Sequence, residues 1–283
     1  MKLSQAKPSA TQSVLVFGPP KCGKTQLVGQ LATQYKLIWF DLENGSATLH
    51  KLPPEAQDRV ELISLPDSRS YPIAIETCLK VIKGNPCTID EETGKVLPPT
   101  GKRIEGRSYV DINLNAVGSD TIVVFDSLTQ LTNSAIAHIT KNQPDDYKLN
   151  YDDWGNLGKL MDIFLSHVQT AKFNVVCISH ETETELEDGK MKIVPVAGTR
   201  AFSRNSAKYF GHVVYAQVAL KKHTFTSSTV ALNNIVAGSR TDVATEKMDE
   251  PSLIPIFSQA VPTNQSNGQV ALAQLSNLRT LKK

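Results

Sequence analysis

Short hydrophobic runs recur along the first two thirds of the chain, and each ends at a polar or glycine-containing stretch. β-Branched and aromatic residues are frequent in these runs, as is typical of strands buried on both faces of a parallel sheet. The predicted strands cover residues 13–17, 37–40, 60–65, 121–125 and 174–179.

Stretches with helical periodicity separate these runs, and they cover residues 24–35, 72–83, 128–140 and 153–172. Pro72 suits the first turn of its helix, where a missing backbone N–H costs nothing. The alternation of strand and helix predicts an α/β fold in which right-handed crossovers join a mostly parallel central sheet.

Three later or longer stretches break this alternation. Residues 182–196 alternate around Asp188-Gly189, a turn that favours a β-hairpin. Residues 213–220 and 225–236 predict antiparallel strands at the C-terminal edge of the sheet. Residues 84–119 are polar, contain several Gly and Pro, and lack helical periodicity, and a connection of that length is usually functional or mobile.

These patterns divide the chain into three parts. An N-terminal tail covers residues 1–12, and a core covers 13–261 with residues 84–119 as a long insertion. Residues 262–283 predict a linker followed by a C-terminal helix with leucines at three-residue steps.

The segment between the first strand and the first helix matches the pattern G-x-x-x-x-G-K-[ST]. Its glycines let backbone N–H groups converge on phosphate oxygens. Lys24 is expected to reach the β- and γ-phosphates of ATP, and Thr25 to offer its hydroxyl to Mg²⁺. The alternative is a structural turn rich in Gly and Pro. The residues expected to hold the nucleotide are Gly18, Pro19, Pro20, Lys21, Cys22, Gly23, Lys24, Thr25 and Gln26.

Two acidic side chains follow strands that end at the same edge of the predicted sheet, where ligands of open sheets bind. Asp126 is the expected partner of Thr25 at the metal, although it also suits the N-terminal cap of the next helix. Glu43 is the expected general base that orients the attacking water. Asp41 competes for this role, and a plain polar turn is the remaining alternative.

Composition limits the partners and the cellular compartment that fit this chain. The 283 residues carry a net charge of only +2, so any contact with nucleic acid has to come from local patches. The four cysteines show no C-x-x-C spacing, which favours a reducing, cytoplasmic compartment. No apolar run approaches the roughly 20 residues of a membrane span, and the polar start lacks a secretory signal.

With these residues placed, the chain resembles the RecA-like recombinase ATPases. It is most similar to their short, core-only bacteriophage relatives, the Sak-type single-strand annealing ATPases. The resemblance runs from about residue 13 to residue 220 and implies a RecA-like P-loop NTPase core. The segments that carry it are VLVFGPPKCGKT, IWFDLENG, ELISLPDSRSYPIAIETCLKVI, TIVVFDSLTQL, and NVVCISHE followed by GTRAFSRNSAKYFGHVVYAQV.

The resemblance also implies roles for individual residues. It places the catalytic glutamate at Glu43 and the γ-phosphate sensor at His180. It assigns Lys208 to the cation that reaches the nucleotide of a neighbouring subunit, with Arg200 and Arg204 as rivals.

The implied function is a Mg²⁺-dependent, DNA-stimulated ATPase that binds single-stranded DNA and acts in bacteriophage recombination or annealing, in the host cytoplasm. A homo-oligomer, either ring or filament, is implied as well. Two alternatives remain open: a ring helicase or loader motor, and an ATP-binding accessory that recruits a single-strand binding protein through its C-terminal tail.

Three departures from the family pattern qualify this picture. Only about a dozen residues precede the core, whereas RecA proteins dock on their neighbours through an N-terminal segment. The insertion at 84–119 has no counterpart in the RecA core. The expected DNA loop is acidic, with Glu181, Glu183, Glu185, Glu187 and Asp188.

Strand-binding residues are sought among local cations, because affinity comes chiefly from Lys and Arg on phosphates. The candidates are Arg200, Arg204 and Lys208, then Lys221, Lys222 and His223, and, in the insertion, Lys95, Lys102, Arg103, Arg107 and Tyr109. A solvated surface is the alternative for each group. Phe257 begins an F-x-x-A pattern of the kind that RecA relatives insert into the next subunit, and an ordinary strand-edge Phe is the alternative.

Overall fold

The computed structural model describes residues 11–98, 100–185, 189, 191–219, 222–227, 234–240 and 251–258. Within them, the main sheet has nine strands, and its central path runs β10-β9-β1-β7-β6-β2-β3. β8 pairs with the end of β7, and β11 pairs with β9. The strands are β1 (Ser13–Gly18), β2 (Lys36–Asp41), β3 (Val60–Ser64), β6 (Thr121–Asp126), β7 (Asn174–Glu185), β8 (Met191–Pro195), β9 (His212–Ala219), β10 (Lys222–Thr226) and β11 (Gly238–Ser239).

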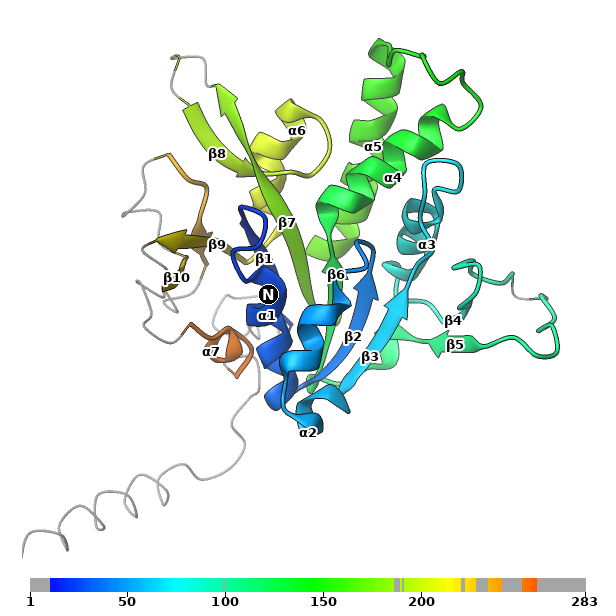
Figure 1. Cartoon of the computed structure of the whole chain (residues 1–283), viewed down its shortest axis with the longest axis horizontal. Coiled ribbons are helices and arrows are strands. Elements are labelled where there is room, and N and C mark those ends of the chain that lie inside the picture. Colours follow the sequence, from blue (N-terminus) through cyan, green and yellow to red (C-terminus); the bar gives the residue numbers. More distant parts are fainter. Residues whose placement is uncertain are drawn as a thin grey trace, which may run out of the picture.

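Helices cover both faces of this sheet (Figure 1). Along β1, Leu15 and Phe17 face the cluster under α3, α4 and α5, whereas Val14 and Val16 face the cluster under α1 and α7. This two-sided burial explains why the strands are continuous apolar runs. The helices are α1 (Lys24–Gly29), α2 (Pro54–Gln57), α3 (Ile73–Val81), α4 (Leu128–Thr140), α5 (Tyr151–Gln169), α6 (Arg200–Asn205) and α7 (Ile254–Ser258), with 3₁₀ turns η2 (Gln30–Thr33), η3 (Ser46–Lys51), η4 (Leu114–Ala116) and η5 (Ser206–Tyr209).

The register of the parallel strands brings their carboxyl ends to one edge. Gly18 at the end of β1 pairs with His180 of β7, and Asp41 of β2 pairs with Asp126 of β6. β7 lies between β1 and β6. The residues that follow these four strands therefore meet above the same edge of the sheet.

The expected α/β fold with a mostly parallel sheet and an antiparallel C-terminal edge is confirmed. The prediction for residues 213–220 was half right, because β9 is antiparallel to β10 but parallel to β1. The first helix is shorter than predicted: α1 ends at Gly29, and a 3₁₀ turn follows. Leu49 of η3 packs so close to Gly29 that a Cβ there would lie 2.8 Å from Leu49 Cδ2.

Two other elements are longer than expected. β7 continues to Glu185, because its second half leaves the main path and pairs with β8 as the predicted hairpin. α5 begins at Tyr151 rather than near 153, because Asn150 and Asp153 form a reciprocal capping box at its start.

The insertion at 84–119 contains a folded unit. β4 (Cys87–Asp90) and β5 (Tyr109–Ile112) form a separate antiparallel pair, which projects to one side of the main sheet (Figure 1). Ile89, Ile112 and Leu114 are buried in the cluster that also contains α3.

Phe257 corrects one expectation. Its side chain is 1% exposed, and its ring lies 5.9 Å from that of Tyr35 in the same chain. A phenylalanine packed in its own core is not available to a neighbouring subunit, so the F-x-x-A interpretation is wrong. Gln259 and Ala260 of that pattern, the linker and the C-terminal helix lie outside the described residues.

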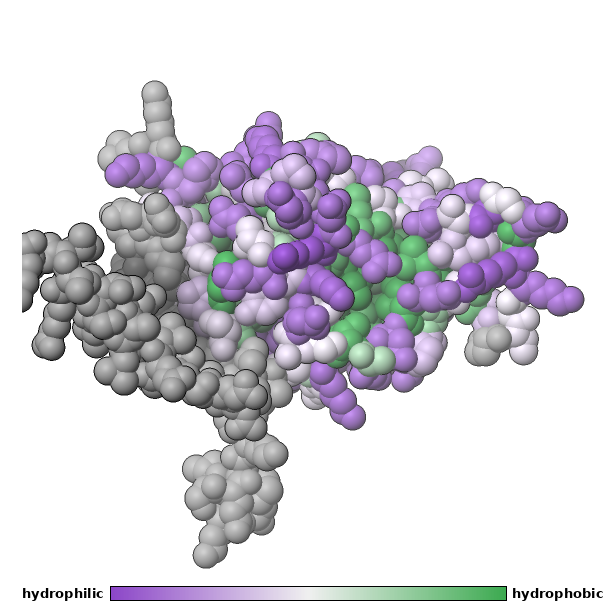
Figure 2. Space-filling view, turned by 90° about the horizontal axis from the view of Figure 1, so that it is seen from below, coloured by the Kyte–Doolittle hydropathy of each residue, from purple (hydrophilic) through white to green (hydrophobic). Residues whose placement is uncertain are grey.

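Among the described helices, none is both long and apolar enough to cross a membrane. Figure 2 views the molecule from below, opposite the carboxyl ends of the main strands. This side is largely hydrophilic, with one band of hydrophobic residues through its middle.

Candidate active site

The segment from Gly18 to Thr25, called the phosphate loop below, needs its glycines for steric reasons. Gly18 has φ 153°, and a Cβ on it would lie 2.0 Å from the carbonyl oxygen of Ala216. Gly23 has φ 92° and stands just before α1. A side chain at Gly18 would collide with β9, and one at Gly23 would strain the backbone and press on His223.

Lys24 is buried at the centre of the loop. Its Nζ donates to the carbonyl oxygens of Gly18, at 3.0 Å, and Pro19, at 2.7 Å. Burial lowers the pKa of Lys24, although the neighbouring Cys22, Asp126 and Glu43 act in the opposite direction. A buried ammonium group enclosed by loop carbonyls fits a site that receives the phosphates of a nucleotide.

Thr25 and Asp126 provide the oxygens expected at a metal ion. Thr25 Oγ1 donates to Asp126 Oδ2 at 3.1 Å. Asp126 is 3% exposed, and burial together with the charge of Glu43 raises its pKa to about 7, against the hydrogen bond from Thr25. A cation beside this carboxylate would offset the cost of burying its charge.

Within the part of the chain that the structure describes, no cluster of three or more His, Cys, Asp or Glu side chains is placed to hold a metal ion. Mg²⁺ does not need one, because it commonly keeps several waters and uses one or two protein oxygens together with substrate phosphates. The pair Thr25–Asp126 fits Mg²⁺ bound together with a nucleotide.

Asp41 and Glu43 have different surroundings. Asp41 is 1% exposed and accepts hydrogen bonds from the backbone N–H groups of Glu43, Gly45 and Ser46, at 3.0 to 3.2 Å. Its carboxylate fixes the turn after β2. The Glu43 side chain is 30% exposed, so it remains accessible to water and substrate.

Glu43 is held by two donors from other strands. Ser127, which follows Asp126 through a cis peptide bond, donates its hydroxyl to Glu43 Oε1. His180 Nε2 lies 3.4 Å from Glu43 Oε2. Burial alone would raise the pKa of Glu43, but the hydrogen bonds from His180 and Ser127 outweigh it and lower this pKa. Glu43 is therefore ionised at neutral pH, as a proton acceptor must be.

His180 connects the phosphate loop to Glu43. Its Nδ1 lies 3.4 Å from Lys24 Nζ. A charged ammonium can only donate, so Nδ1 accepts, and the ring proton is on Nε2, facing Glu43. The structure thus brings together Lys24 and Thr25 at the start of α1, Glu43 after β2, Asp126 of β6 and His180 of β7.

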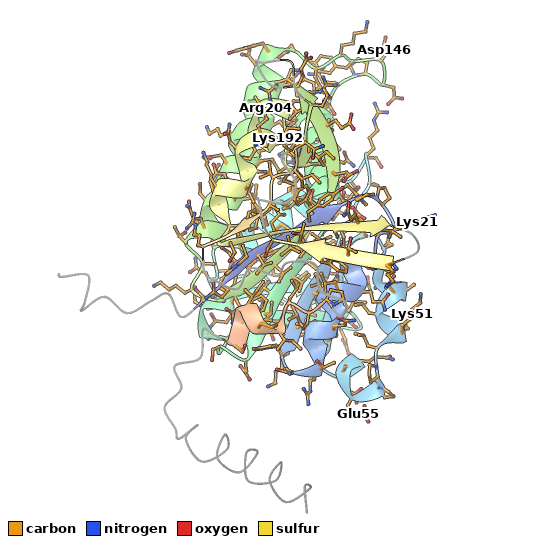
Figure 3. The ribbon with its side chains drawn as sticks, turned by 90° about the vertical axis from the view of Figure 1, so that its left-hand side faces the viewer. Lys21, Lys51, Glu55, Asp146, Lys192 and Arg204 are labelled. Atoms are coloured by element: carbon orange, nitrogen blue, oxygen red, sulfur yellow. The ribbon has the colours of Figure 1, made fainter. Side chains whose placement is uncertain are left out.

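Of the three candidates for a cation acting on a neighbouring subunit, Lys208 and Arg204 lie away from this cluster. Arg200 begins α6, shortly after β8, whose last residue Pro195 pairs with Glu181 beside His180. Lys208 is exposed, its Nζ lies 4.8 Å from the ring centroid of Tyr209, and it precedes β9 near the amino end of β1. Arg204 is fixed on the β7–β8 hairpin by hydrogen bonds to Thr184 Oγ1 and the Glu185 carbonyl. Figure 3 shows Arg204 beside Lys192 and well separated from Lys21 of the phosphate loop.

Candidate strand-binding cations differ in availability. Arg200 and Lys222 are exposed, and Lys221 lies outside the described residues. Arg103 pairs with Asp111 at 2.6 Å, and Arg107 pairs with Asp90 at 2.9 Å, so carboxylates of the insertion already neutralise these two arginines.

Two contacts of the site had no signal in the sequence. Ser127 adjoins Asp126, but nothing in the sequence indicates that its hydroxyl reaches Glu43 across the sheet. His223 of β10 binds the carbonyl oxygen of Cys22, 201 positions away in the chain.

A buried strand leading into such a loop, with an acidic residue at the end of a parallel strand two places away in the sheet, defines a P-loop nucleotide-binding protein. The family model described as an AAA domain matches residues 10–241, most of the chain, and the protein belongs to this family. It is an AAA-type P-loop ATPase domain.

No curated protein matches the chain. Among solved structures, an ATPase from the type III secretion system of pathogenic bacteria matches with a TM-score of 0.40 and 13% sequence identity. The match covers 73% of this chain and 51% of that ATPase, so the chain spans about half of its length.

Proposed function

We propose that the protein is a Mg²⁺-dependent ATPase that binds single-stranded DNA and promotes strand annealing during recombination. The observation that carries the enzymatic part is the convergence of Lys24, Thr25, Asp126, Glu43 and His180 on one edge of the sheet. Each of these groups suits one requirement of phosphoryl transfer to water.

In this reaction, the loop amides hold the α- and β-phosphates, and Lys24 reaches the β- and γ-phosphates. Glu43 orients a water molecule and accepts its proton as the oxygen attacks the γ-phosphorus. The bond from the γ-phosphorus to the bridging oxygen breaks, and ADP and phosphate are the products. Bound Mg²⁺ would neutralise charge on the phosphates, next to Thr25 and Asp126.

His180 links this chemistry to the state of the phosphate loop. In the structure, its ring bridges Lys24 and Glu43. Arrival of a γ-phosphate supplies a strong new acceptor for Lys24 and changes the partners of His180. This arrangement supports the γ-phosphate sensor role implied by the resemblance.

The DNA-binding part rests on exposed cations and on the resemblance to Sak-type annealing ATPases. Arg200 and Lys222 are exposed and form no ion pair with any described residue. Such side chains are suited to the phosphates of a strand. The acidic β7–β8 hairpin opposes binding along its own length, so the contact is expected beside it, on α6 and β10.

Assembly into a ring or filament is part of the same proposal. Lys208 lies in η5, just before β9, and the first residues of β9 pair with the start of β1, so Lys208 is too far from the phosphate loop of its own chain to serve it. A neighbouring subunit whose nucleotide faces Lys208 gives this exposed lysine a role.

The test is ATP hydrolysis by purified protein, with and without single-stranded DNA, alongside annealing of complementary oligonucleotides. We expect Mg²⁺-dependent hydrolysis that DNA stimulates, and faster annealing with ATP. Displacement of a paired strand from a free tail would favour a helicase or loader motor instead. Nucleotide binding without turnover, together with capture of a single-strand binding protein that is lost on deleting residues 262–283, would favour an accessory role.

A further inference from the structure

The β9–β10 hairpin contacts both ends of the phosphate loop. At the start of the loop, the carbonyl oxygen of Ala216 on β9 occupies the space beside Gly18 where a Cβ would lie. At the end of the loop, His223 Nδ1 lies 2.9 Å from the carbonyl oxygen of Cys22. One hairpin therefore braces the loop from outside, and the mechanism described above does not use it.

The contact at His223 is closely fitted. A Cβ on Gly23 would lie 3.0 Å from His223 Nδ1 and 3.4 Å from its Cε1, so the imidazole ring packs directly against this glycine. A carbonyl oxygen can only accept a hydrogen bond, and His223 Nδ1 is therefore the donor. Hydrogen bond and ring packing act on the same peptide unit.

The orientation of this peptide unit matters for nucleotide binding. The carbonyl of Cys22 and the N–H of Gly23 belong to one planar trans peptide, and they point in opposite directions. Fixing the carbonyl outward on His223 aims the Gly23 N–H toward the inside of the loop. In a loop of this pattern, such N–H groups hold the α- and β-phosphates.

We propose that His223 is a positioning residue for the phosphate loop: it orients the Cys22–Gly23 peptide and thereby sets nucleotide affinity. This positioning role rests on the nucleotide site described above and not on DNA binding, whereas the coupling described below also rests on the proposed strand binding. Since the contact serves the α- and β-phosphates, its loss weakens ADP and ATP binding by the same factor. Loss of Glu43 or His180, in contrast, affects only steps that involve the γ-phosphate.

His223 also follows two basic residues in the sequence. Lys222 and Lys221, two candidates for strand binding, immediately precede it in the sequence. Lys222 is exposed on the hairpin that holds the loop. We therefore expect a strand bound at Lys222 to shift this hairpin, so that strand and nucleotide change each other's affinity. Such coupling is reciprocal by thermodynamic necessity.

The experiment measures dissociation constants of fluorescent ADP and ATP analogues for three substitutions. His223→Phe keeps a ring but removes the donor, and we expect both nucleotides to bind about three- to tenfold more weakly, the usual effect of one lost hydrogen bond. His223→Asn places an amide nitrogen close to the position of Nδ1, and we expect it to restore most of the affinity. His223→Gln places its amide nitrogen near Nε2 and should not.

His50→Ala is the matched control, because it removes an exposed imidazole from η3, outside the loop. Wild-type affinity in His223→Phe would overturn the inference. Equal losses in all three variants, accompanied by equal falls in melting temperature, would also overturn it, because they indicate a structural role only. Neither result would affect the proposed ATPase, which depends on Lys24 and Glu43.

The coupling between strand binding and nucleotide affinity is measured separately. In the wild type, we expect a single-stranded oligonucleotide to change the affinity for the ADP analogue, and His223→Phe to abolish most of that change while still binding the oligonucleotide. An unchanged linkage in His223→Phe would refute the route through His223.

Discussion

Asp41 and Glu43 leave the same strand two residues apart, yet their surroundings give them different chemistry. The carboxylate of the buried Asp41 accepts hydrogen bonds from three backbone N–H groups. Glu43, in contrast, contacts Ser127 and His180 and stays partly exposed. The sequence left both residues open as the general base. The geometry favours Glu43, because a base has to reach a water at the γ-phosphate.

The first prediction concerns this difference. Glu43→Gln should bind ATP with near wild-type affinity but hydrolyse it roughly 10²- to 10⁴-fold more slowly, the usual loss when a general base is removed. Nucleotide binding and steady-state turnover measured on one preparation check this. Asp41→Asn is the contrasting variant, since it should mainly lower the melting temperature. Full activity in Glu43→Gln would show that another group is the base.

A second residue-scale prediction concerns Gly18. With φ 153° and the carbonyl oxygen of Ala216 2.0 Å from the position of a Cβ, Gly18→Ala forces β1 and β9 apart. We expect a loss of about 2 kcal/mol or more in the free energy of unfolding, and loss of nucleotide binding. Denaturant unfolding measures the former.

Gly45→Ala is the matched control for Gly18→Ala. Gly45 has φ −89°, and a Cβ there meets nothing within 4 Å. Its stability should change by less than about 0.5 kcal/mol. Equal effects of the two substitutions would contradict the steric argument.

At the scale of elements, the strands and helices of the core follow directly from the pattern of hydrophobic positions. Runs such as residues 122–125 are apolar throughout because both faces of the sheet are covered, and this signal is local. The direction of β9 relative to β1 was not predictable, because it depends on which strand lies beside it after the hairpin. Likewise, nothing near His223 in the sequence shows that it reaches Cys22.

The N-terminal segment, β9 and β11 meet at His212, and this contact is expected to depend on pH. His212 is 1% exposed, its Nδ1 lies 2.8 Å from Ser239 Oγ, and its Nε2 lies 3.0 Å from Gln12 Oε1. Burial, followed by the charge of Arg240, lowers the pKa of His212 below its ordinary 6.5. The unfolded chain therefore binds this proton more readily than the folded one.

Stability from His212 is fully present above the unfolded pKa near 6.5 and is lost as the pH falls through the lower folded pKa. We expect the melting temperature to fall between pH 7.5 and pH 5, and this fall to be smaller in His212→Gln. His167→Gln, a substitution near the end of α5, is the control. An unchanged pH dependence in His212→Gln would contradict this account.

At the scale of the whole molecule, the catalytic cluster and Lys208 occupy different parts of the chain. Lys208 is exposed and lies near the amino end of the sheet, whereas Glu43 lies at its carboxyl edge. If Lys208 serves the nucleotide of a neighbour, the two residues that complete one site come from two subunits. This expectation came only from the family resemblance, since neither charge nor spacing in the sequence indicates it.

A mixture of two variants tests whether two subunits share one site. Lys208→Ala and Glu43→Gln should each be nearly inactive alone, but a mixture should regain activity, because some interfaces then combine an intact Glu43 with an intact Lys208. In a randomly mixed cyclic assembly, about a quarter of the sites are complete. A mixture as inactive as its components would exclude the shared site.

The decisive experiment compares ATP hydrolysis by the wild type and by Lys24→Ala, each with and without Mg²⁺ and single-stranded DNA. The account predicts hydrolysis by the wild type that requires Mg²⁺ and increases with DNA, and neither nucleotide binding nor hydrolysis in Lys24→Ala. A wild-type protein that neither binds nor hydrolyses ATP with Mg²⁺, or a Lys24→Ala variant that hydrolyses it as fast as the wild type, would contradict the account.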